Sequence, residues 1–383
     1  MRIFNHDIMN CTHQQVIGNH LYSGRVLGLT EPKDMVQLHP ALRSEWQAVI
    51  EHYDRIGLRH SQNVIWDISS AVRLAHPQIE SSVFYFGDSE NPISFRSQQF
   101  RYQDQRWHDV VQYMNNKNNF MELAHQLGVT VPKTLCFSQK ADVRLNSQIP
   151  YPCYVKPSVS VDGMGIVRCA DQQQLLLALY DMPENTPFQL QEEVLAASFL
   201  NLQYRIAENG LERHAATEQI LDGCSHSGNR YPTEYQPWDL VDPMAQWMLE
   251  QGMKDIFAFD VAVVFSSSGP RYYAIECNPR YNGASYPTGV AFKLGIKSWI
   301  CETFTTPFHS LSDFDLSGIE FDAKTGVGVI LINWGSIHTG KVVCLLAGSH
   351  AQQDRLRIIL KQRLNSEAQI NVLMPSFHSL ESV

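Results

Sequence analysis

Hydrophobic and polar residues alternate along this chain in patterns that predict both strands and helices. The runs Asn63–Ile68 and Ile256–Phe265 have the length and the apolar content of buried strands. Leu42–Ile56 and Lys117–Leu127 repeat apolar residues at helical spacing, and Gly128 follows the second run as a helix stop. Because the two kinds of pattern intermix, we expect an α/β fold.

Beyond position 150 the predicted elements follow one another closely. A strand, a small-residue loop, a second strand, a helix and a third strand are expected at Tyr151–Lys156, Pro157–Gly165, Ile166–Cys169, Gln172–Tyr180 and Phe188–Leu195. Asp239–Gly252 is expected to form a helix capped by Asp239 or Asp242, and Arg271–Cys277 a strand that follows Ile256–Phe265 after a turn. Two strands and a helix should complete the last lobe, at Gly326–Asn333, Lys341–Leu346 and Gln352–Leu364.

Composition and charge narrow the classes of protein to which the chain can belong. The chain has 383 residues, of which 44% are hydrophobic and 18% charged, so it is long enough for two or three packed units and too apolar for disorder. Its net charge is −9, its basic residues form no run, and no apolar stretch approaches the ~20 residues of a membrane-spanning helix. Nucleic acid and membrane are therefore not expected as partners.

The cysteines argue against a disulfide framework or a zinc ribbon, because all eight are scattered and no CxxC pair occurs. Several of them fall within apolar, strand-like runs and are expected to be buried thiols, including Cys153, Cys169, Cys277 and Cys344. Together with a first segment that lacks an apolar signal region, this usage predicts a protein of the reducing cytoplasm.

The first candidate motif is a lysine at the end of a predicted strand. Lys156 is followed by Ser158–Gly165, a loop of small residues that contains Gly163 and Gly165. Glycines allow backbone N–H groups to approach phosphate oxygens closely, and the ammonium group adds positive charge. The order differs from the GxxxxGK[ST] phosphate loop, because here the lysine precedes the glycines. Taken alone, an ordinary hairpin with an exposed lysine is the better interpretation.

The second candidate motif is a set of polar residues on two neighbouring apolar strands. Asp260 interrupts the first strand, whereas Glu276 and Asn278 end the second, two positions apart and therefore on one face. Buried carboxylates need a cation or strong hydrogen bonds, and three oxygen ligands suit a Mg²⁺ ion shared with phosphates. Arg280 follows on the same face, where it could hold a phosphoryl oxygen. The alternative, a carboxylate–arginine pair that only fixes the strand ends, is about equally good without the lysine loop.

In their order along the chain, these motifs resemble those of the ATP-grasp superfamily, over nearly half the sequence. The resemblance implies that one group of residues binds the nucleotide: Lys117, Lys156, Ser158, Gly163, Gly165, Glu192 and Leu195. The lysines and the loop would hold the phosphates, and Glu192 with the backbone near Leu195 would contact the adenine edge. By the same resemblance Asp260, Glu276 and Asn278 would bind Mg²⁺, and Arg280 with Lys156 would act on the transferred phosphoryl group.

The resemblance also implies a fold and a domain organisation. In the ATP-grasp fold two lobes built on β-sheets clasp ATP, here after an N-terminal α/β domain. The expected boundaries are residues 1–113 for the N-terminal domain, 114–194 for the small lobe and 195–383 for the large lobe. ATP and Mg²⁺ are the implied cofactors, with two metal ions for which Mn²⁺ can substitute, and a homodimer is a family-level expectation.

Two regions are most similar to pheganomycin-type peptide ligases, which join a carboxylate to an amine. They are Thr217–Gly223 with Gly228–Pro232, and Asn278–Pro287. Four residues within them are expected near the substrate: Gln219, Tyr231, Ser285 and Tyr286. For the two tyrosines a buried ring with a satisfied hydroxyl is the plainer interpretation. The serine lacks the G-x-S-x-G elbow of a nucleophile.

The implied activity is ATP-dependent formation of an amide or peptide bond through an acyl phosphate, with release of ADP and phosphate, in natural-product (peptide or siderophore-like) biosynthesis. Small-molecule carboxylates and amines are the implied substrates. Two alternatives stay open, a ligase that acts on a carrier-protein thiol and a nucleotide-binding regulator without turnover. The regulator gains support from Ala196–Phe199, because this stretch lacks the ribose-binding carboxylate of many ATP-grasp members. In a second departure, Ala258-Phe259 stands where some members have an arginine.

Overall fold

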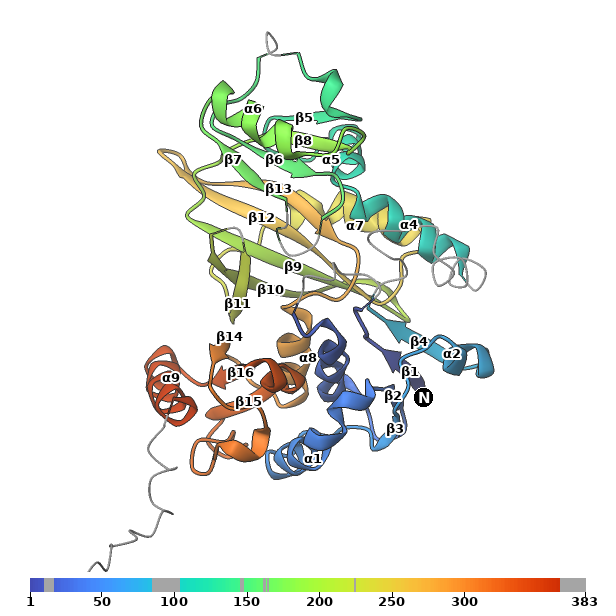
Figure 1. Cartoon of the computed structure of the whole chain (residues 1–383), viewed down its shortest axis with the longest axis vertical. Coiled ribbons are helices and arrows are strands. Elements are labelled where there is room, and N and C mark those ends of the chain that lie inside the picture. Colours follow the sequence, from blue (N-terminus) through green and yellow to red (C-terminus); the bar gives the residue numbers. More distant parts are fainter. Residues whose placement is uncertain are drawn as a thin grey trace, which may run out of the picture.

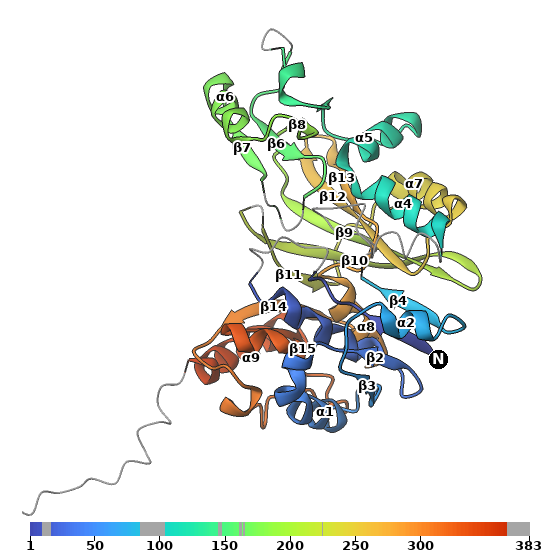
Figure 2. The same ribbon diagram turned by 45° about the vertical axis from the view of Figure 1, so that its right-hand side comes forward.

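The strands of the described residues form three separate sheets, which follow one another along the chain. The computed structural model describes residues 1–9, 17–84, 104–144, 148–160, 163, 165–223 and 225–365. Figure 1 shows the small-lobe sheet at the top, the large sheet from the middle to the lower left and the N-terminal sheet at the lower right, and Figure 2 shows the same arrangement after a turn of 45°. No helix in these described ranges is long and apolar enough to cross a membrane.

The N-terminal sheet is parallel, with the strand order β3-β2-β1-β4. Its strands are β1 (Arg2–Asn5), β2 (Met35–Gln37), β3 (Asn63–Ile65) and β4 (Glu80–Val83). Parallel neighbours require crossover connections, which here contain the 3₁₀ helices η1 (Asn19–Leu29) and η2 (Pro40–Glu45) and the helices α1 (Trp46–Arg55) and α2 (Ala71–Ala75). The α/β unit predicted for this part of the chain is confirmed.

The small-lobe sheet is antiparallel, with the strand order β5-β8-β6-β7. Its strands are β5 (Thr134–Phe137), β6 (Cys153–Pro157), β7 (Val167–Cys169) and β8 (Phe188–Glu192). Helices α5 (Lys117–Gln126) and α6 (Gln172–Asp181) accompany it, together with the short η3 (Lys140–Asp142). The predicted burial of Cys153 and Cys169 is confirmed, because both thiols lie in the core of this lobe.

The large sheet has the strand order β13-β12-β9-β10-β11-β14-β16-β15, and all its neighbours are antiparallel. The strands are β9 (Ser198–Ala207), β10 (Gly210–Asp222), β11 (Ser225–Tyr231), β12 (Ile256–Ser266), β13 (Gly269–Asn278), β14 (Trp299–Thr305), β15 (Gly328–Asn333) and β16 (Lys341–Ala347). The accompanying helices are α4 (Gln105–Asn115), α7 (Trp238–Gln251), α8 (Ser285–Lys293), α9 (His350–Leu364), η4 (Leu311–Asp313) and η5 (Trp334–Thr339). The prediction that the last two strands and α9 complete this lobe is confirmed.

The predicted cap of α7 is wrong, whereas its predicted end is confirmed. The helix begins at Trp238, after Pro237, and no side chain caps it. Both predicted caps are engaged elsewhere, because Asp239 and Asp242 pair with Arg213 of β10. Gly252 ends the helix in the left-handed conformation, with a φ of 101°, which a glycine adopts without strain.

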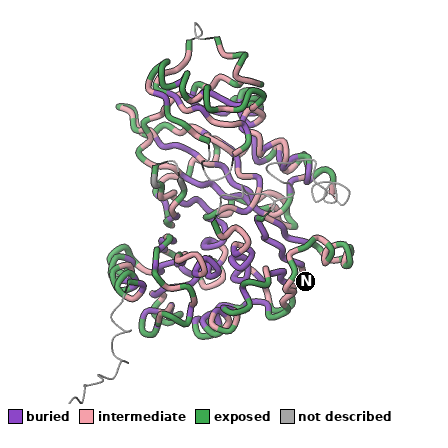
Figure 3. Tube along the Cα trace, viewed as in Figure 1, coloured by how far each residue is buried: buried purple, intermediate pink, exposed green. Residues whose placement is uncertain are grey.

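The hydrophobic core of the N-terminal sheet is continuous with that of the C-terminal strands. Val36 and Tyr53 belong to one apolar cluster with Ile330 of β15 and Leu345 of β16. A second cluster joins α4, α5 and α7 to the large sheet, and a third fills the small lobe. Buried stretches run through the interior strands, and outer helices such as α9 expose one face (Figure 3). The two ends of the chain therefore form one packed body.

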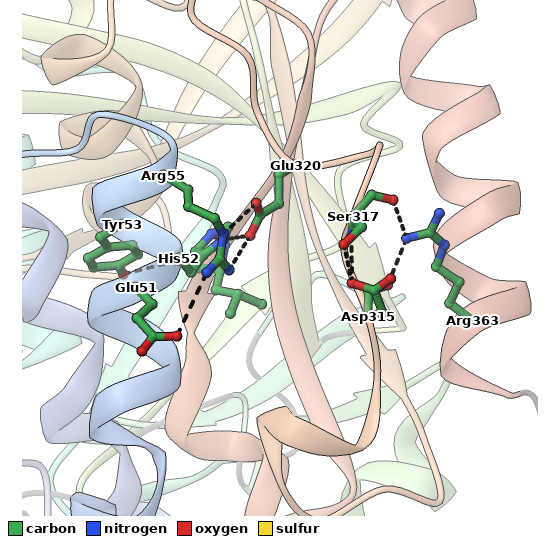
Figure 4. A network of polar contacts seen from close by, with 9 residues as sticks. Glu51, His52, Tyr53, Arg55, Asp315, Ser317, Glu320 and Arg363 are labelled. Carbon is green, nitrogen blue, oxygen red and sulfur yellow. Dashed lines mark hydrogen bonds and ion pairs between the residues drawn. The ribbon is translucent and has the colours of Figure 1, made fainter. Parts of the chain in front are cut away.

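A polar network centred on the buried His52 fastens α1 to the C-terminal part of the chain (Figure 4). His52 Nδ1 lies 2.7 Å from Glu320 Oε1, and His52 Nε2 accepts the backbone N–H of Leu331 at 3.1 Å. Since Nε2 accepts, the proton of the neutral ring must sit on Nδ1, from which it is donated to the carboxylate. Arg55 donates two further hydrogen bonds to the same carboxylate, from Nε at 2.9 Å and Nη2 at 2.7 Å.

We expect Glu320→Gln to lower the free energy of unfolding by about 1–3 kcal/mol at pH 7, the range for hydrogen bonds to a charged group. Burial acts to raise the pKa of Glu320, but the bonds from His52 and Arg55 outweigh it and hold the pKa at about 2. The unfolded carboxyl titrates near pH ~4.3. The stabilisation is therefore complete above that pH and is lost as the pH falls toward 2. Urea unfolding at pH 7 and pH 3.5 should show the difference between the two proteins shrinking at the lower pH.

The matched control is Glu51→Gln, on the same helix. Glu51 is 54% exposed and lies 3.9 Å from Arg55, so this substitution should cost less than about 0.5 kcal/mol. Equal losses for the two variants, or a Glu320→Gln loss that does not depend on pH, would contradict the assignment.

Candidate active site

A cleft of about 360 Å³ opens where the three parts of the protein meet. The small-lobe side contributes Lys117 and Gly163, the large sheet contributes Asp260 and Glu276, and the N-terminal unit contributes Arg25. The cleft therefore gathers residues whose positions in the sequence are up to 335 apart, from Ile8 to Val343. Its walls combine cationic groups and carboxylates.

Lys117 connects the small lobe to the large sheet. Asn116 caps α5 by accepting the N–H groups of Asn118 and Asn119, which fixes Lys117 as the first residue of the helix. The backbone N–H of Lys117 donates to the carbonyl of Ser158 at 2.7 Å, so the helix start is tied to the end of β6. Its Nζ lies 3.2 Å from Glu276 Oε2. The ammonium group is thus placed at the mouth of the phosphate loop predicted from the sequence.

The three predicted metal ligands lie together at the β12–β13 hairpin. Asp260 and Glu276 are directly opposite each other across the two strands, and the side chain of Asn278 reaches the same place. Asp260 Oδ2 accepts a hydrogen bond from Asn278 Nδ2 at 3.0 Å. Asp260 Oδ1 accepts another, at 2.7 Å, from Nδ2 of Asn201 on the neighbouring strand β9. Cys277 points to the other face, where it is buried, as the strand alternation predicts.

The two carboxylates of this hairpin have opposite pKa shifts. Burial, and then the charge of Glu276, raise the pKa of Asp260 to about 7. Burial would also raise the pKa of Glu276, but Lys117 and Lys156 outweigh it, so the pKa lies below its usual value. The positive charge around Asp260 and Glu276 is therefore too small to keep both carboxylates ionised.

A divalent cation fits this deficit of charge. Two carboxylates and an amide oxygen are hard oxygen donors of the kind that Mg²⁺ takes alongside phosphate oxygens. In the described part of the chain no group of three or more histidine, cysteine, aspartate or glutamate side chains is arranged to hold a metal ion. Substrate oxygens and water would have to complete the coordination of any ion held by Asp260, Glu276 and Asn278.

Arg280 lies in the same cleft, beyond the end of β13. Its Nη1 donates a hydrogen bond of 2.9 Å to Asn115 Oδ1, at the end of α4. Its guanidinium carbon is 5.7 Å from the centre of the Phe84 ring. The hydrogen bond and the ring contact hold the guanidinium at the wall that the hairpin carboxylates also line.

The other predicted phosphate-binding residues lie in the small lobe. Lys156 donates to Gln191 Oε1 at 2.6 Å and is outside the cleft lining, although its charge acts on Glu276. Ser158 is buried, and its N–H donates to the carbonyl of Pro187 at 2.8 Å. Gly163 and Gly165 have φ values of 73° and 74°, the left-handed region in which a glycine is unstrained. Residues 161, 162 and 164 of this loop lie outside the described residues.

The residues predicted to contact adenine do not line the cleft. Glu192 ends β8, and its Oε1 accepts the N–H of Lys133 at 2.7 Å. Leu195, in the connection to β9, is 83% exposed. These positions are compatible with a hinge between the small lobe and the large sheet, and their adenine contacts stay a prediction.

The four predicted substrate residues divide into two pairs. Gln219 and Tyr286 line the cleft, whereas Tyr231 and Ser285 do not. Tyr231 stacks on the ring of Trp299 with a centroid distance of 6.0 Å. Ser285 is buried at the start of α8, and its Oγ accepts the N–H of Asn282 at 3.1 Å. Tyr231 therefore packs against another aromatic ring, and Ser285 stabilises a turn; neither side chain faces the cleft.

Several polar residues of the site were not predicted from the sequence, among them Arg25, Asn201 and Asn333 of the cleft lining and Asn115, which binds Arg280. Asn201 had a usable signal, because it is a polar residue within the apolar run Phe199–Leu202 and therefore needs a buried partner. Asn115 and Arg25 had none, since they reach the site through the packing of distant segments.

Comparisons with known proteins find similar folds among solved structures. An N5-carboxyaminoimidazole synthetase from Staphylococcus aureus, complexed with ADP, is 12% identical, with a TM-score of 0.59 over 86% of this chain and 90% of that chain. An N5-carboxyaminoimidazole ribonucleotide synthetase from Thermus thermophilus is 11% identical, with a TM-score of 0.56 over 96% and 99%. The biotin carboxylase domain of a Hydrogenobacter thermophilus 2-oxoglutarate carboxylase, in complex with MgADP, is 14% identical, with a TM-score of 0.50 over 66% and 67%.

No model of a known protein family matches the chain, and no curated protein matches it either. At the identities found, the likeness to solved structures is a likeness of fold. That likeness extends over nearly the whole length of both chains for the two synthetases. The fold is accordingly an ATP-grasp fold. It consists of the parallel N-terminal sheet, the small antiparallel lobe and the large sheet, with the cleft among them.

Proposed function

We propose that the protein is an ATP-dependent carboxylate–amine ligase that works through an acyl phosphate. One observation carries the proposal, namely the meeting of Lys117 and Arg280 with the carboxylates of Asp260 and Glu276 in a single cleft between the lobes. Phosphoryl transfer depends mainly on positioning and on stabilisation of charge. A cleft that combines cationic side chains with a carboxylate pair suited to Mg²⁺ meets both needs.

In the first step a carboxylate oxygen of the substrate attacks the γ-phosphorus of ATP. The bond from that phosphorus to the bridging oxygen breaks, and ADP leaves with the electron pair. Lys117, Lys156 and Arg280 would hold the phosphoryl oxygens in line with the attacking carboxylate. A Mg²⁺ ion bound by Asp260 and Glu276 would neutralise charge on the phosphate oxygens.

In the second step an amine attacks the carbonyl carbon of the acyl phosphate. The C–N bond forms, the C–O bond to the phosphoryl group breaks, and the amine proton leaves with the released phosphate. Exclusion of water matters here, because an acyl phosphate hydrolyses readily once it is exposed. The cleft walls, which come from all three parts of the protein, would limit the access of water to the intermediate.

The resemblance of two regions to pheganomycin-type ligases supports peptide-like substrates and a role in natural-product biosynthesis. A ligase that acts on a carrier-protein thiol uses the same first step and differs only in the second. A regulator that binds nucleotide without turnover would not need the carboxylate pair. The products formed with each acceptor separate these possibilities.

The decisive experiment measures nucleotide products with Mg²⁺ and pooled amino acids and small amines. ADP and phosphate that appear only when substrate is present would support the ligase, and splitting the pool would identify both substrates. AMP and pyrophosphate would mean adenylation and would refute the mechanism. A mass increase on an added carrier protein would indicate the thiol acceptor, and nucleotide binding without any product would leave the regulator.

We expect Lys156→Ala to raise the Kd for ATP about tenfold and to lower ADP formation as well. The removed ammonium group lies close enough to influence Glu276, so its loss should weaken both the ground state and the transition state. Titration with a fluorescent ATP analogue and the ADP assay together measure the two effects. Lys140→Ala is the control, because Lys140 pairs with Glu184 at 3.0 Å on the same lobe, away from the cleft. An unchanged Kd for Lys156→Ala would contradict the phosphate role.

A further inference from the structure

Arg25 is a buried guanidinium at the wall of the cleft, and the proposed phosphoryl transfer does not use it. It lies on η1 of the N-terminal unit and is only 9% exposed. Its guanidinium carbon is 5.1 Å from the ring centre of Tyr22, 4.7 Å from that of Phe84 and 4.3 Å from that of Tyr286. All four residues line the cleft. Arg25 therefore sits in an aromatic pocket that opens into the candidate active site.

Within the described residues this guanidinium has no anionic or hydrogen-bonding partner. Its Nε and Nη2 atoms are buried and make no hydrogen bond, and no carboxylate lies within ion-pair distance. The same unit pairs another arginine well, because Arg2 Nη2 lies 2.9 Å from Asp255 Oδ2. Stacking on three rings compensates part of the cost of burial. A buried charge without a counter-ion is nevertheless unfavourable unless a ligand supplies one.

We propose that Arg25 binds a carboxylate group of the small-molecule substrate, and that this carboxylate is not the one activated by ATP. The free Nε–Nη2 edge presents two parallel N–H donors, the arrangement that fits a planar carboxylate. A single guanidinium among aromatic rings balances one negative charge, which suits a carboxylate better than a phosphate dianion. The assignment rests on the proposed function, which places the reacting carboxylate at Lys117, Arg280 and the hairpin carboxylates.

A second unsatisfied group narrows the class of substrate. Asn333, at the end of β15, also lines the cleft and is buried, and its Oδ1 accepts no hydrogen bond from the described residues. This oxygen can only accept, so it requires an N–H or O–H donor. A ligand that satisfies both Arg25 and Asn333 carries a carboxylate and a hydrogen-bond donor. An amino acid or a short peptide, bound as the amine substrate, has both groups.

The test compares the thermal unfolding of the wild type with Arg25→Met and Arg43→Met. Methionine keeps much of the side-chain volume and removes the charge. Arg43 is the matched control, because it stacks on Trp66 at 5.3 Å and lies outside the cleft. The probes are the common amino acids and diglycine, each beside its C-terminal amide, and inorganic phosphate, at constant ionic strength, with and without Mg-ADP.

At least one free acid should raise the Tm of the wild type and of Arg43→Met by about 2 °C or more. Its amide should not, and Arg25→Met should not respond to either. Without probes, Arg25→Met should unfold at or above the wild-type Tm, because an unpaired buried charge has been removed. Any of four results would overturn the proposal. A free acid could still raise the Tm of Arg25→Met, or no free acid could raise the Tm of the wild type. Phosphate alone could stabilise the wild type, or Arg25→Met without probes could unfold several degrees below it.

The same measurements separate this proposal from the ligase assignment. The shift caused by Mg-ADP reports the nucleotide site, whereas the acid shift reports Arg25. If Mg-ADP does not raise the Tm of the wild type but a free acid does, the ligase assignment is refuted and the carboxylate subsite remains. If Mg-ADP raises the Tm but no free acid does, only the carboxylate subsite is refuted.

Discussion

Glu276→Gln is expected to lower the rate of ADP formation by about 10²–10³-fold while changing the Kd for ATP by no more than about threefold. The substitution keeps the size of the side chain and removes one of the two carboxylates that face each other across the hairpin. Charge on the phosphate oxygens builds up mainly in the transition state, so a weakened cation site should affect turnover far more than ground-state binding. Single-turnover ADP release and ATP titration measure the two quantities on the same preparation.

Glu302→Gln provides the matched control for this variant. Glu302 lies on β14 of the same sheet, is 23% exposed against 28% for Glu276, and likewise pairs with a cation, Arg357, at 2.7 Å. It does not line the cleft, although its neighbours Cys301 and Thr303 do. Its substitution should leave ADP formation within about twofold. Wild-type turnover in Glu276→Gln would exclude the metal role of this carboxylate.

Arg280→Lys should reduce turnover by about 10²-fold or more, even though the positive charge is kept. A lysine cannot donate to Asn115 and to a phosphoryl oxygen with the fixed geometry of a guanidinium. In GTPases, an arginine that contacts the transferred phosphoryl group contributes about 10³–10⁵-fold to the rate. The hydrogen bond from Nη1 to Asn115 Oδ1, 2.9 Å long, fixes the orientation of the planar group for that contact.

The control for the arginine is Arg271→Lys, at the other end of β13. Arg271 is exposed and lies outside the cleft lining, so ADP formation should stay close to the wild-type rate. The two variants should also share the same Tm within about 2 °C, which shows that the fold is intact. A similar modest loss in both variants would mean that Arg280 only supports the hairpin.

The predicted parts of the site are those governed by short-range regularities. Glu276 and Asn278 are two positions apart on a strand, and alternation alone places them on one face, where both line the cleft. The end of α7 at Gly252 follows from the conformation that glycine adopts without strain. The fold followed from the order of such local patterns, read together with the resemblance of the lysine loop and the carboxylate strands to one superfamily.

The unpredicted parts depend on packing between segments that are far apart in the sequence. Arg25 lies on a 3₁₀ segment without helical periodicity, and η1 is positioned by packing against elements that are distant in the sequence, namely α8, β15 and η5. Asp239 and Asp242 looked like helix caps, but the more distant Arg213 engages both carboxylates. Because the helix begins at Trp238, Asp239 lies within its first turn and Asp242 lies further along, so neither occupies the position before the helix from which a side chain caps it.

The shared core of Val36 and Tyr53 with Ile330 and Leu345 has a consequence for the order of events during synthesis. The N-terminal sheet emerges from the ribosome first, yet the side chains that cover it are made roughly 300 residues later. At about 5–20 residues per second, that interval lasts some tens of seconds. Closing so long a loop is also slow compared with forming local contacts. Until β15 and β16 arrive, the first strands keep an exposed apolar face, and this face is where a chaperone would be needed.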